Sequence, residues 1–169
     1  LFVAYDHVSA EQADILLNLH VRNEENTAFT GRVEFELLDT AGVRKAISFR
    51  SLRILPDSAC TVGGNMRLKR PELWSPESPY LYTLVVRVKD RRGKIVDGYR
   101  RRIGVRSIEF KGQDGFWLNG RPYEQPLIGA NRHQDFAVVG NALSNSLHSR
   151  DAKKLRDDGL KVIRNAHHP

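Results

Sequence analysis

The chain has 169 residues, of which 40% are hydrophobic and 28% charged, with 27 Lys and Arg against 20 Asp and Glu. This length allows one domain, or one domain and part of another, and the composition is ordinary for a globular protein. No apolar stretch approaches the roughly 18 residues of a membrane span, which argues against a membrane protein. The densest basic stretch, residues 89–106, alternates with strand-forming residues and lacks an aromatic stacking array. This pattern argues against nucleic-acid binding.

The ends of the chain and its cysteine content say little about its origin. The chain begins with Leu1 and lacks the basic-then-apolar pattern of a signal peptide, so we expect both ends to be cuts within something larger. The single Cys60 excludes an internal disulfide and indicates no compartment.

The first hundred or so residues predict one strand after another. Residues 14–23 and 31–39 alternate apolar and polar side chains, as half-buried strands do. Residues 80–90 and 94–105 predict two further strands that flank a hairpin loop at Arg91, Arg92 and Gly93. Turn-forming residues separate strands at 23–26, 39–42, 56–58 and Gly63-Gly64. About seven short strands without a helical period predict an immunoglobulin-like β-sandwich over residues 1–107.

A proline-rich segment, residues 71–84, interrupts the run of strands. Its three prolines, Pro71, Pro76 and Pro79, have no N–H to donate to a β-ladder, so we expect an ordered loop that crosses one end of the sandwich. Trp74 in this loop is predicted to be buried as a packing residue rather than presented for ligand stacking.

The pattern changes after Arg106. Residues 115–123 contain Asn119-Gly120, a strong hairpin signal because a type I′ turn needs positive φ at both central residues. Residues 126–131 are a short apolar run that suits a strand covered on both faces. Residues 149–159 predict a helix with Ser149 as its N-cap and Gly159 just past its end. Residues 160–164 predict a second covered strand.

The order strand, helix, strand is a βαβ unit, so the two strands should be parallel neighbours. Sites in parallel sheets and barrels form beyond the carboxyl ends of the strands. We therefore expect two polar clusters to converge on one rim. They are Asn131, Arg132, His133 and Asp135 after the first strand, and Arg164, Asn165, His167 and His168 after the second.

The rim residues allow three interpretations. Imidazole, guanidinium and amide groups suit a polar ligand with many hydroxyls, or a developing oxyanion. Alternatively, His133, Asp135 and His167 or His168 offer nitrogen and oxygen ligands for zinc. Paired metal spacings such as HxxxH are absent, however, and adjacent histidines on an extended backbone cannot readily reach one ion. The third interpretation is that these residues only end the strands and bind water.

Five segments, in this order and at this spacing, resemble glycoside hydrolase family 2, the β-galactosidase and β-glucuronidase group. They are WSPESPYLYTL, IGVRSIEF, FWLNGRPY, IGANRHQDF and VIRNAHHP. The resemblance implies a mainly β chain in which the immunoglobulin-like sandwich of residues 1–107 precedes a (β/α)8 TIM barrel. Residues 108–169 then form the truncated start of that barrel, its first βαβ unit.

The resemblance also implies roles for the rim. His133 and His167 match the histidines that contact the sugar after the first and second barrel strands. Arg164 resembles the arginine that supports the catalytic carboxylates. The remaining substrate-binding residues implied by the resemblance are Asn131, Arg132 and Asp135.

Departures from the family pattern affect the substrate more than the family. Ile128 stands where many relatives have Arg, and His168 stands where Tyr is common. Retaining glycosidases use two carboxyl groups about 5 Å apart. In this family both are glutamates of later barrel strands, and no acidic residue of this chain matches them. We therefore expect a parent protein that is a retaining exo-β-glycosidase, most similar to a β-galactosidase, and a chain that is inactive alone.

The resemblance implies a carbohydrate substrate with a terminal β-linked sugar and no metal or cofactor held by this chain, with Mg²⁺ or Na⁺ as candidate ions of the parent. We expect self-association through residues 124–164, because an incomplete barrel leaves apolar strand edges uncovered. Two other classes stay open. One is a stand-alone immunoglobulin-like binding module, and the other is a fragment of a metal-dependent hydrolase.

Overall fold

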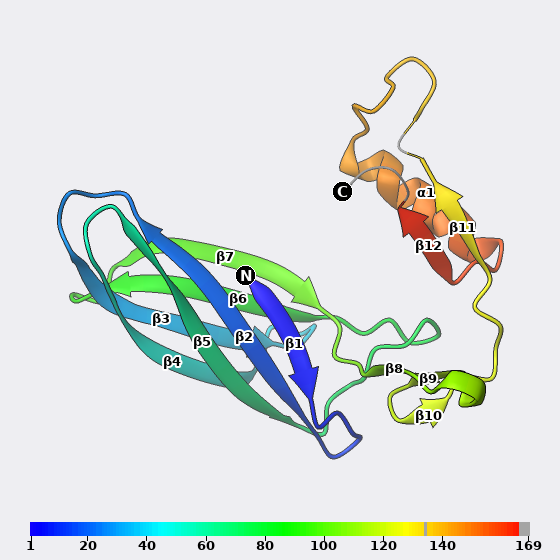
Figure 1. The fold of residues 1–169 in the computed structure, drawn as a ribbon, viewed down its shortest axis with the longest axis horizontal. Helices are drawn as coiled ribbons and strands as arrows, with labels where there is room; N and C mark the ends of the chain where they lie inside the picture. Colours follow the sequence, from blue (N-terminus) through cyan, green and yellow to red (C-terminus); the bar gives the residue numbers. More distant parts are fainter. Residues whose placement is uncertain (134, 166–169) are drawn as a thin grey trace. The chain divides into compact units, whose positions relative to one another are not determined.

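A computed structural model describes residues 1–133 and 135–165 of the chain (Figure 1). The chain divides into two compact units, Leu1–Pro122 and Tyr123–Pro169. The domain boundary predicted at 107/108 therefore lies ahead of the division between the compact units, because the short strands of residues 108–122 group with the sandwich.

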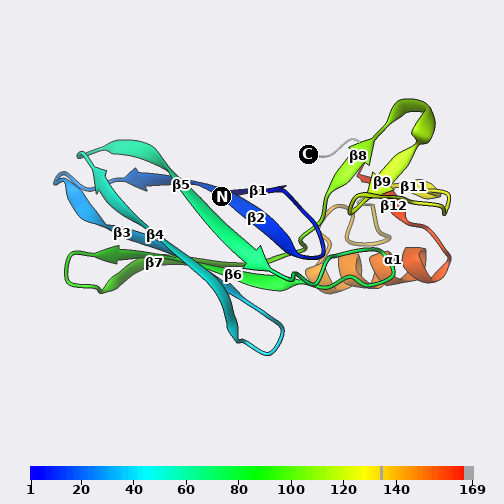
Figure 2. The same cartoon turned by 90° about the horizontal axis from the view of Figure 1, so that it is seen from below.

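The first unit contains the predicted β-sandwich, built from seven antiparallel strands in two sheets. Figure 2 shows the three-stranded sheet lying over the four-stranded one. The three-stranded sheet has the order β1 (Phe2–Asp6), β2 (Gln12–Asn23), β5 (Ser58–Lys69). The four-stranded sheet has the order β4 (Arg44–Ile54), β3 (Phe29–Leu38), β6 (Tyr82–Asp90), β7 (Ile95–Ile103). The fold prediction of a mainly β, immunoglobulin-like chain is confirmed.

The core lies between the two sheets and follows the period-two pattern of the sequence. In β3, the alternate residues Val33, Phe35 and Leu37 are fully buried. In β2, Ile15 and Leu17 face them with 0% and 1% exposure. Because burying such a side chain contributes about 1.5–3 kcal/mol, this layer is the main source of the unit's stability.

The predicted turn at Gly63-Gly64 is wrong, because both glycines lie inside the long strand β5, opposite Asn18 and Leu17 of β2. A Cβ atom placed on Gly64 would meet Phe35 Cε2 at 2.8 Å, whereas one on Gly63 would find its nearest neighbour, Asn18 Oδ1, at 3.8 Å. Gly64 is therefore required by the close approach of a core ring and not by a turn.

Residues 71–81 form the predicted loop, but Trp74 in it is half-buried rather than buried. Its backbone N–H donates to Val105 O at 2.8 Å, and the Arg106 guanidinium lies 4.6 Å from the centroid of its ring. A Cβ atom on Gly104 would lie 2.8 Å from Trp74 Cδ1, so the indole packs directly on the backbone. One edge of the ring stays accessible because it packs at the end of the sandwich, outside the layer between the sheets.

A small antiparallel sheet follows the sandwich. It consists of β8 (Ile108–Phe110), β9 (Phe116–Leu118) and β10 (Arg121–Pro122), with the short 3₁₀ helix η1 (Gly112–Asp114) between β8 and β9. Asn119 and Gly120 have φ values of 54° and 75°, which confirms the predicted turn. The Asn119 side chain connects this sheet to the loop, because its Oδ1 accepts from Ser107 N at 3.1 Å and its Nδ2 donates to Trp74 O at 3.1 Å.

The second unit is a βαβ unit with β11 (Gly129–Arg132), α1 (Asn145–Asp157) and β12 (Val162–Asn165). The two strands pair in parallel, as predicted. The helix begins earlier than predicted, because Ser144, not Ser149, has the extended backbone of an N-cap and accepts a hydrogen bond from Leu147 N at 3.4 Å. Gly159 ends the helix as predicted, with φ of 87° and the paired bonds Gly159 N to Arg156 O and Leu160 N to Leu155 O.

The prediction that these strands are covered on both faces is wrong for the described structure. All four residues of β12 are exposed, with Val162 and Ile163 at 42% each. The helix has no buried residue, so within the described residues the βαβ unit covers little of its own apolar surface. No helix among the described residues is long and apolar enough to cross a membrane.

Candidate functional site

The carboxyl ends of β11 and β12 bring two of the predicted rim residues together. The parallel register aligns Asn131 with Arg164, and Arg164 Nη1 donates to Asn131 Oδ1 at 3.3 Å. Both side chains are exposed. They come from positions 33 residues apart in the sequence, so the contact depends on the crossover through α1.

Arg132 lies on the other face of β11, because side chains alternate along a strand. Its Nη2 donates to Asp151 Oδ2 of α1 at 2.7 Å, and the two side chains are only 16% and 25% exposed. The hydrogen bond from Arg132 lowers the pKa of the Asp151 carboxyl below its usual value, and Arg150 adds to this effect. The structure thus places Arg132 in the strand–helix interface instead of beside Asn131 and Arg164.

The other predicted rim residues are placed only in part. His133 follows β11 directly and is exposed, and Asp135 is exposed two residues later. His167 and His168 lie outside the described residues. Within the described part of the chain, no group of three or more His, Cys, Asp and Glu side chains comes together in a way that could hold a metal ion.

The exposed side chains at the end of the parallel strand pair offer hydrogen-bond donors, an amide acceptor on Asn131 and a carboxylate acceptor on Asp135. The Arg164 guanidinium donates only, and the Asn131 amide both donates and accepts. Such a set matches vicinal hydroxyl groups, which also donate and accept. We define the rim from here on as Asn131, His133, Asp135 and Arg164.

The pairing of Arg132 with Asp151 of α1 was not predicted from the sequence. The sequence did contain a signal for this pair. A βαβ unit packs one face of each strand against its helix, and side chains alternate along a strand, so Arg132 faces the helix if its neighbour Asn131 faces away. The misplaced helix start concealed it, since moving the N-cap from Ser149 to Ser144 puts Asp151 in the second turn of α1 rather than the first.

The fold defines a class of protein in which an immunoglobulin-like sandwich precedes, along the chain, a βαβ unit with polar side chains at its strand ends. Residues 1–106 match the model of the family described as glycosyl hydrolases family 2. This match spans more than half of the chain, and the chain belongs to this family.

Individual relatives agree with the family. The chain is 35% identical over 162 residues to a putative β-glucuronidase of Formosa agariphila, and this alignment covers 96% of this chain and 19% of that protein. A crystal structure of a putative β-galactosidase from Bacteroides fragilis superposes with a TM-score of 0.87 at 31% identity, over 99% of this chain and 24% of that one. Bacteroides uniformis β-glucuronidase 2, covalently bound to cyclophellitol-6-carboxylate aziridine, matches with a TM-score of 0.87 at 28% identity, over 99% and 20%. The chain spans about a fifth of the length of these relatives.

Proposed function

We propose that the chain provides the sandwich and the first barrel strands of a retaining exo-β-glycosidase, and that its rim binds the terminal sugar of the substrate. The observation that carries this proposal is the Arg164–Asn131 contact at the carboxyl ends of two parallel strands. Under this proposal His167 joins the rim, and Arg132 contributes by holding the strand against α1.

The catalytic step needs two carboxyl groups about 5 Å apart, one as nucleophile and one as acid and base. We assign both to later barrel strands, outside this chain, so the 169 residues alone have no hydrolytic activity. Covalent capture of the Bacteroides uniformis enzyme by an aziridine supports a mechanism with an enzymic nucleophile, because a reactive ring of this kind is opened by one.

The substrate is a terminal β-galactoside. Terminal β-glucuronides are the second candidate, which is favoured by the 35% identity to a putative β-glucuronidase. The two sugars differ at two carbons: the C4 hydroxyl is axial in the galactoside and equatorial in the glucuronide, and C6 is a hydroxymethyl group in the galactoside and a carboxylate in the glucuronide. The residues that distinguish them must therefore contact the C4 hydroxyl or the C6 group.

The test is expression of the complete product of the encoding gene, followed by assays with p-nitrophenyl β-galactoside and β-glucuronide. Proton NMR of the first product identifies the mechanism, since a retaining enzyme releases the β-anomer first. The variants Asn131→Ala and Arg164→Met are expected to lower kcat/KM by about 10- to 100-fold, because each removes a charged or amide hydrogen bond to the sugar. Arg22→Gln, on the sandwich surface, serves as the control.

Release of the α-anomer first would contradict the retaining mechanism. Unchanged kcat/KM in both rim variants would contradict the role of the rim. Hydrolysis by the 169-residue chain alone would contradict the placement of the carboxylates, and a reading frame that ends at Pro169 would favour a binding module instead.

A further inference from the structure

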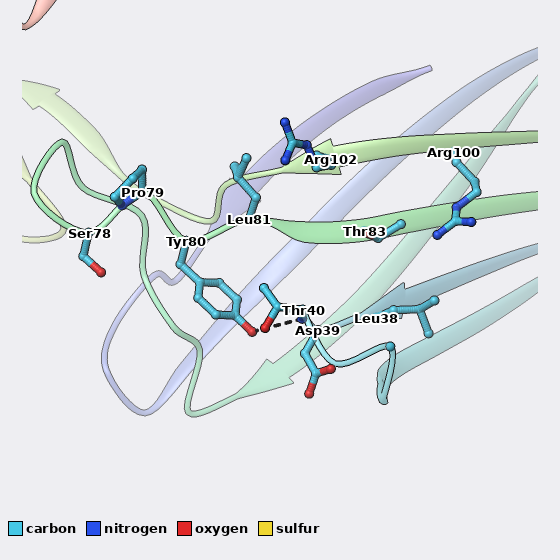
Figure 3. Close-up of a pocket in the computed structure, with 11 residues that line it drawn as sticks. Leu38, Asp39, Thr40, Ser78, Pro79, Tyr80, Leu81, Thr83, Arg100 and Arg102 are labelled. Atoms are coloured by element: carbon cyan, nitrogen blue, oxygen red, sulfur yellow. Dashed lines mark hydrogen bonds between the residues drawn. The ribbon is translucent and has the colours of Figure 1, made fainter. Parts of the chain in front are cut away.

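A hollow of about 600 Å³ lies at one end of the four-stranded sheet, far in sequence from the rim (Figure 3). The strand registers place Leu38, Thr83 and Arg102 in one row across β3, β6 and β7. Leu37 and Leu84, next to them in sequence, are fully buried, so the row belongs to the outer face of the sheet. The hollow therefore opens away from the core.

The charges on this outer face divide into a neutralised set and an unneutralised set. Lys89 Nζ lies 2.6 Å from Glu34 Oε2, and Arg87 Nη1 lies 2.9 Å from Glu34 Oε1 and 2.6 Å from Glu36 Oε2. Two cations and two carboxylates thus balance each other in the middle of the sheet, and Arg44 Nη1 of β4 lies 3.8 Å from Glu36 Oε1 at the edge of this network. This ionic network leaves little charge for a ligand.

Arg100 and Arg102 differ from that network. Among the described residues, neither guanidinium has a carboxylate within 4.0 Å, and both line the hollow. Asp39 also lines it, but its Oδ1 is held by the N–H groups of Ala41 and Val43 at 2.9 and 2.8 Å in the turn after β3. Figure 3 shows the Arg100 side chain reaching from β7 toward Thr83 of β6.

The opposite wall of the hollow is a fixed aromatic and hydroxyl surface. The Tyr80 ring packs edge-on against the buried Tyr82 ring, with centroids 4.9 Å apart, and its hydroxyl accepts from Thr40 N at 3.4 Å. Ser78 is held in place because its N–H donates to Ser75 Oγ and its carbonyl accepts from Ser75 N, each at 3.0 Å. Preorganised walls of this kind reduce the entropic cost of binding.

The field around the hollow attracts anions. The four strands of this sheet carry ten Lys or Arg residues against four Asp or Glu residues. A surface of one sign raises the local concentration of ligands of the opposite sign. The single fixed tyrosine wall suits one ring of a ligand and not a run of stacked bases.

We propose that this hollow binds an acidic saccharide. The carboxylate or sulfate group pairs with Arg100 and, after rotation of an exposed side chain, with Arg102, since a guanidinium group binds two oxygens of such an anion through two parallel hydrogen bonds. The pyranose ring lies against Tyr80 and Pro79, and its hydroxyls reach the hydroxyl groups of Ser78 and Thr83. This site is separate from the rim and independent of the proposed hydrolysis.

The test uses the 169-residue chain and isothermal titration calorimetry. The probe is a tetrasaccharide that alternates glucuronic acid and N-acetylglucosamine, and the comparison ligands are its carboxyl-reduced neutral form and inorganic sulfate. The double variant Arg100→Gln/Arg102→Gln is expected to bind the acidic probe at least about tenfold more weakly, because charged hydrogen bonds are lost. The control Arg91→Gln/Arg92→Gln removes the same charge from the far end of the β6–β7 hairpin and should bind like the parent chain.

Several results would overturn the proposal. Equal weakening in both double variants would reveal unspecific attraction by net charge. Binding of the neutral form or of sulfate as tightly as the acidic probe would remove the acidic saccharide as the ligand. Loss of binding in Arg164→Met, with binding kept in Arg100→Gln/Arg102→Gln, would place the ligand on the rim. Absence of binding by the parent chain, whose folding is verified by its thermal transition, would reject the site altogether.

Discussion

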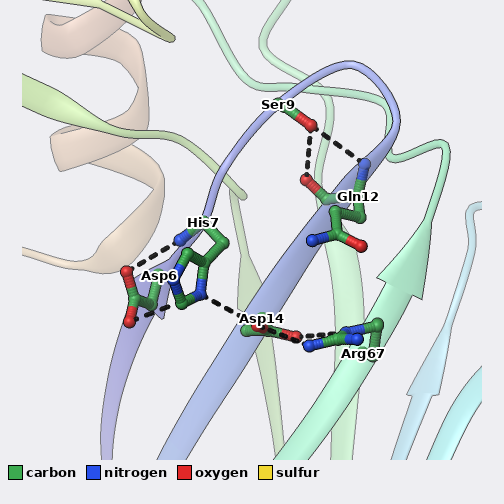
Figure 4. A network of polar contacts seen from close by, with 6 residues as sticks. All are labelled: Asp6, His7, Ser9, Gln12, Asp14 and Arg67. Carbon is green, nitrogen blue, oxygen red and sulfur yellow. Dashed lines mark hydrogen bonds and ion pairs between the residues drawn. The ribbon is translucent and has the colours of Figure 1, made fainter.

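Asp14 of β2 and Arg67 of β5 lie directly opposite each other and form a two-point ion pair (Figure 4). Arg67 Nε lies 2.8 Å from Asp14 Oδ1, and Arg67 Nη2 lies 3.1 Å from Asp14 Oδ2. His7 Nδ1, from the turn after β1, lies 3.1 Å from the same Oδ2. The Asp14 side chain is only 9% exposed, and the hydrogen bond from Arg67 is the main cause that lowers the pKa of its carboxyl.

The variant Asp14→Asn should lower the thermal unfolding temperature at neutral pH, because it removes the charged partner of Arg67. A carboxyl whose folded pKa is depressed stabilises the fold above its unfolded pKa, about 3.9, and this stabilisation is lost as pH falls through the folded pKa. The difference in unfolding temperature between the parent and Asp14→Asn should therefore be greatest above about pH 5 and shrink below about pH 4. Asp6→Asn, at a 59% exposed carboxylate, is the control and should change little. A difference that stays constant down to pH 2 would contradict the pairing.

The contact between Gly64 and Phe35 predicts opposite effects at two adjacent glycines. Gly64→Ala places a methyl group 2.8 Å from the Phe35 ring and should destabilise the fold by about 1–3 kcal/mol in denaturant unfolding. Gly63→Ala points to the other face, with its nearest neighbour at 3.8 Å, and should be neutral or stabilising by about 0.5 kcal/mol. Phe35→Leu should reduce the additional cost of Gly64→Ala. Equal destabilisation by the two alanine substitutions would show that the contact with Phe35 is not the reason why Gly64 is required.

The same glycines show where sequence reasoning succeeds and where it stops. Local alternation predicted strands of the sandwich, because inward-facing residues such as Val33, Phe35 and Leu37 of β3 are apolar. The sequence predicts a turn at Gly64 because a pair of glycines looks the same in a sequence whether it allows the positive φ of a turn or leaves room for a neighbouring ring. Only the pairing of β5 with β2, more than 40 residues away, decides between the two.

Two substitutions of Asn119 should distinguish the contribution of its positive φ from that of its side-chain hydrogen bonds to Ser107 and Trp74. Asn119→Gly keeps the positive φ of 54° but loses the bonds to Ser107 N and Trp74 O, and should cost about 1–3 kcal/mol. Asn119→Ala adds about 1 kcal/mol more, since a β-carbon disfavours the left-handed conformation. Both free energies of unfolding are to be measured by denaturant unfolding monitored by Trp fluorescence. If Asn119→Gly were as stable as the parent, the side-chain bridge would have no role in holding the small sheet.

The exposed apolar residues of the second unit predict self-association. Ile128, directly before β11, is 58% exposed, and Val162 and Ile163 of the short strand β12 are 42% exposed each. Sedimentation velocity of the 169-residue chain should give an average mass that rises with concentration. Val162→Lys/Ile163→Lys should return it to the monomer mass, whereas the matched surface variant Leu55→Lys on the sandwich, 60% exposed, should not. A concentration-independent monomer in the parent chain would reject this prediction.

The rim was predictable in its location and only partly in its members. Parallel pairing after a βαβ pattern is a topological rule, so the approach of Asn131 and Arg164 followed from the sequence. The direction of Arg132 did not, because it depends on which face of β11 meets α1, and that depends on the strand boundary to within one residue. The predicted position of His167 is not tested, because this residue lies outside the described part of the chain.

Arg132 and Arg164 therefore predict different effects for the same substitution. Arg132→Gln breaks the 2.7 Å ion pair with Asp151. It should therefore speed amide hydrogen exchange in α1 at neutral pH, where Asp151 is charged and the pair protects the helix. The Arg132 hydrogen bond depresses the pKa of Asp151, so this stabilisation exists above the unfolded pKa and disappears as pH falls through the folded pKa. The effect of Arg132→Gln on exchange should accordingly fade in acid.

Arg164→Gln is the matched control, because it removes one guanidinium from the other strand and leaves the Asp151 pair intact. It should leave exchange in α1 unchanged, because the exposed guanidinium contacts Asn131 and not the Asp151 pair. If the proposed role of the rim is right, it should instead lower kcat/KM of the complete gene product by at least about tenfold. The ratio of the two effects is the informative quantity. If Arg164→Gln loosened α1 as much as Arg132→Gln did, then both arginines would serve the packing of the βαβ unit, and the rim would lose its main candidate for contacting the sugar.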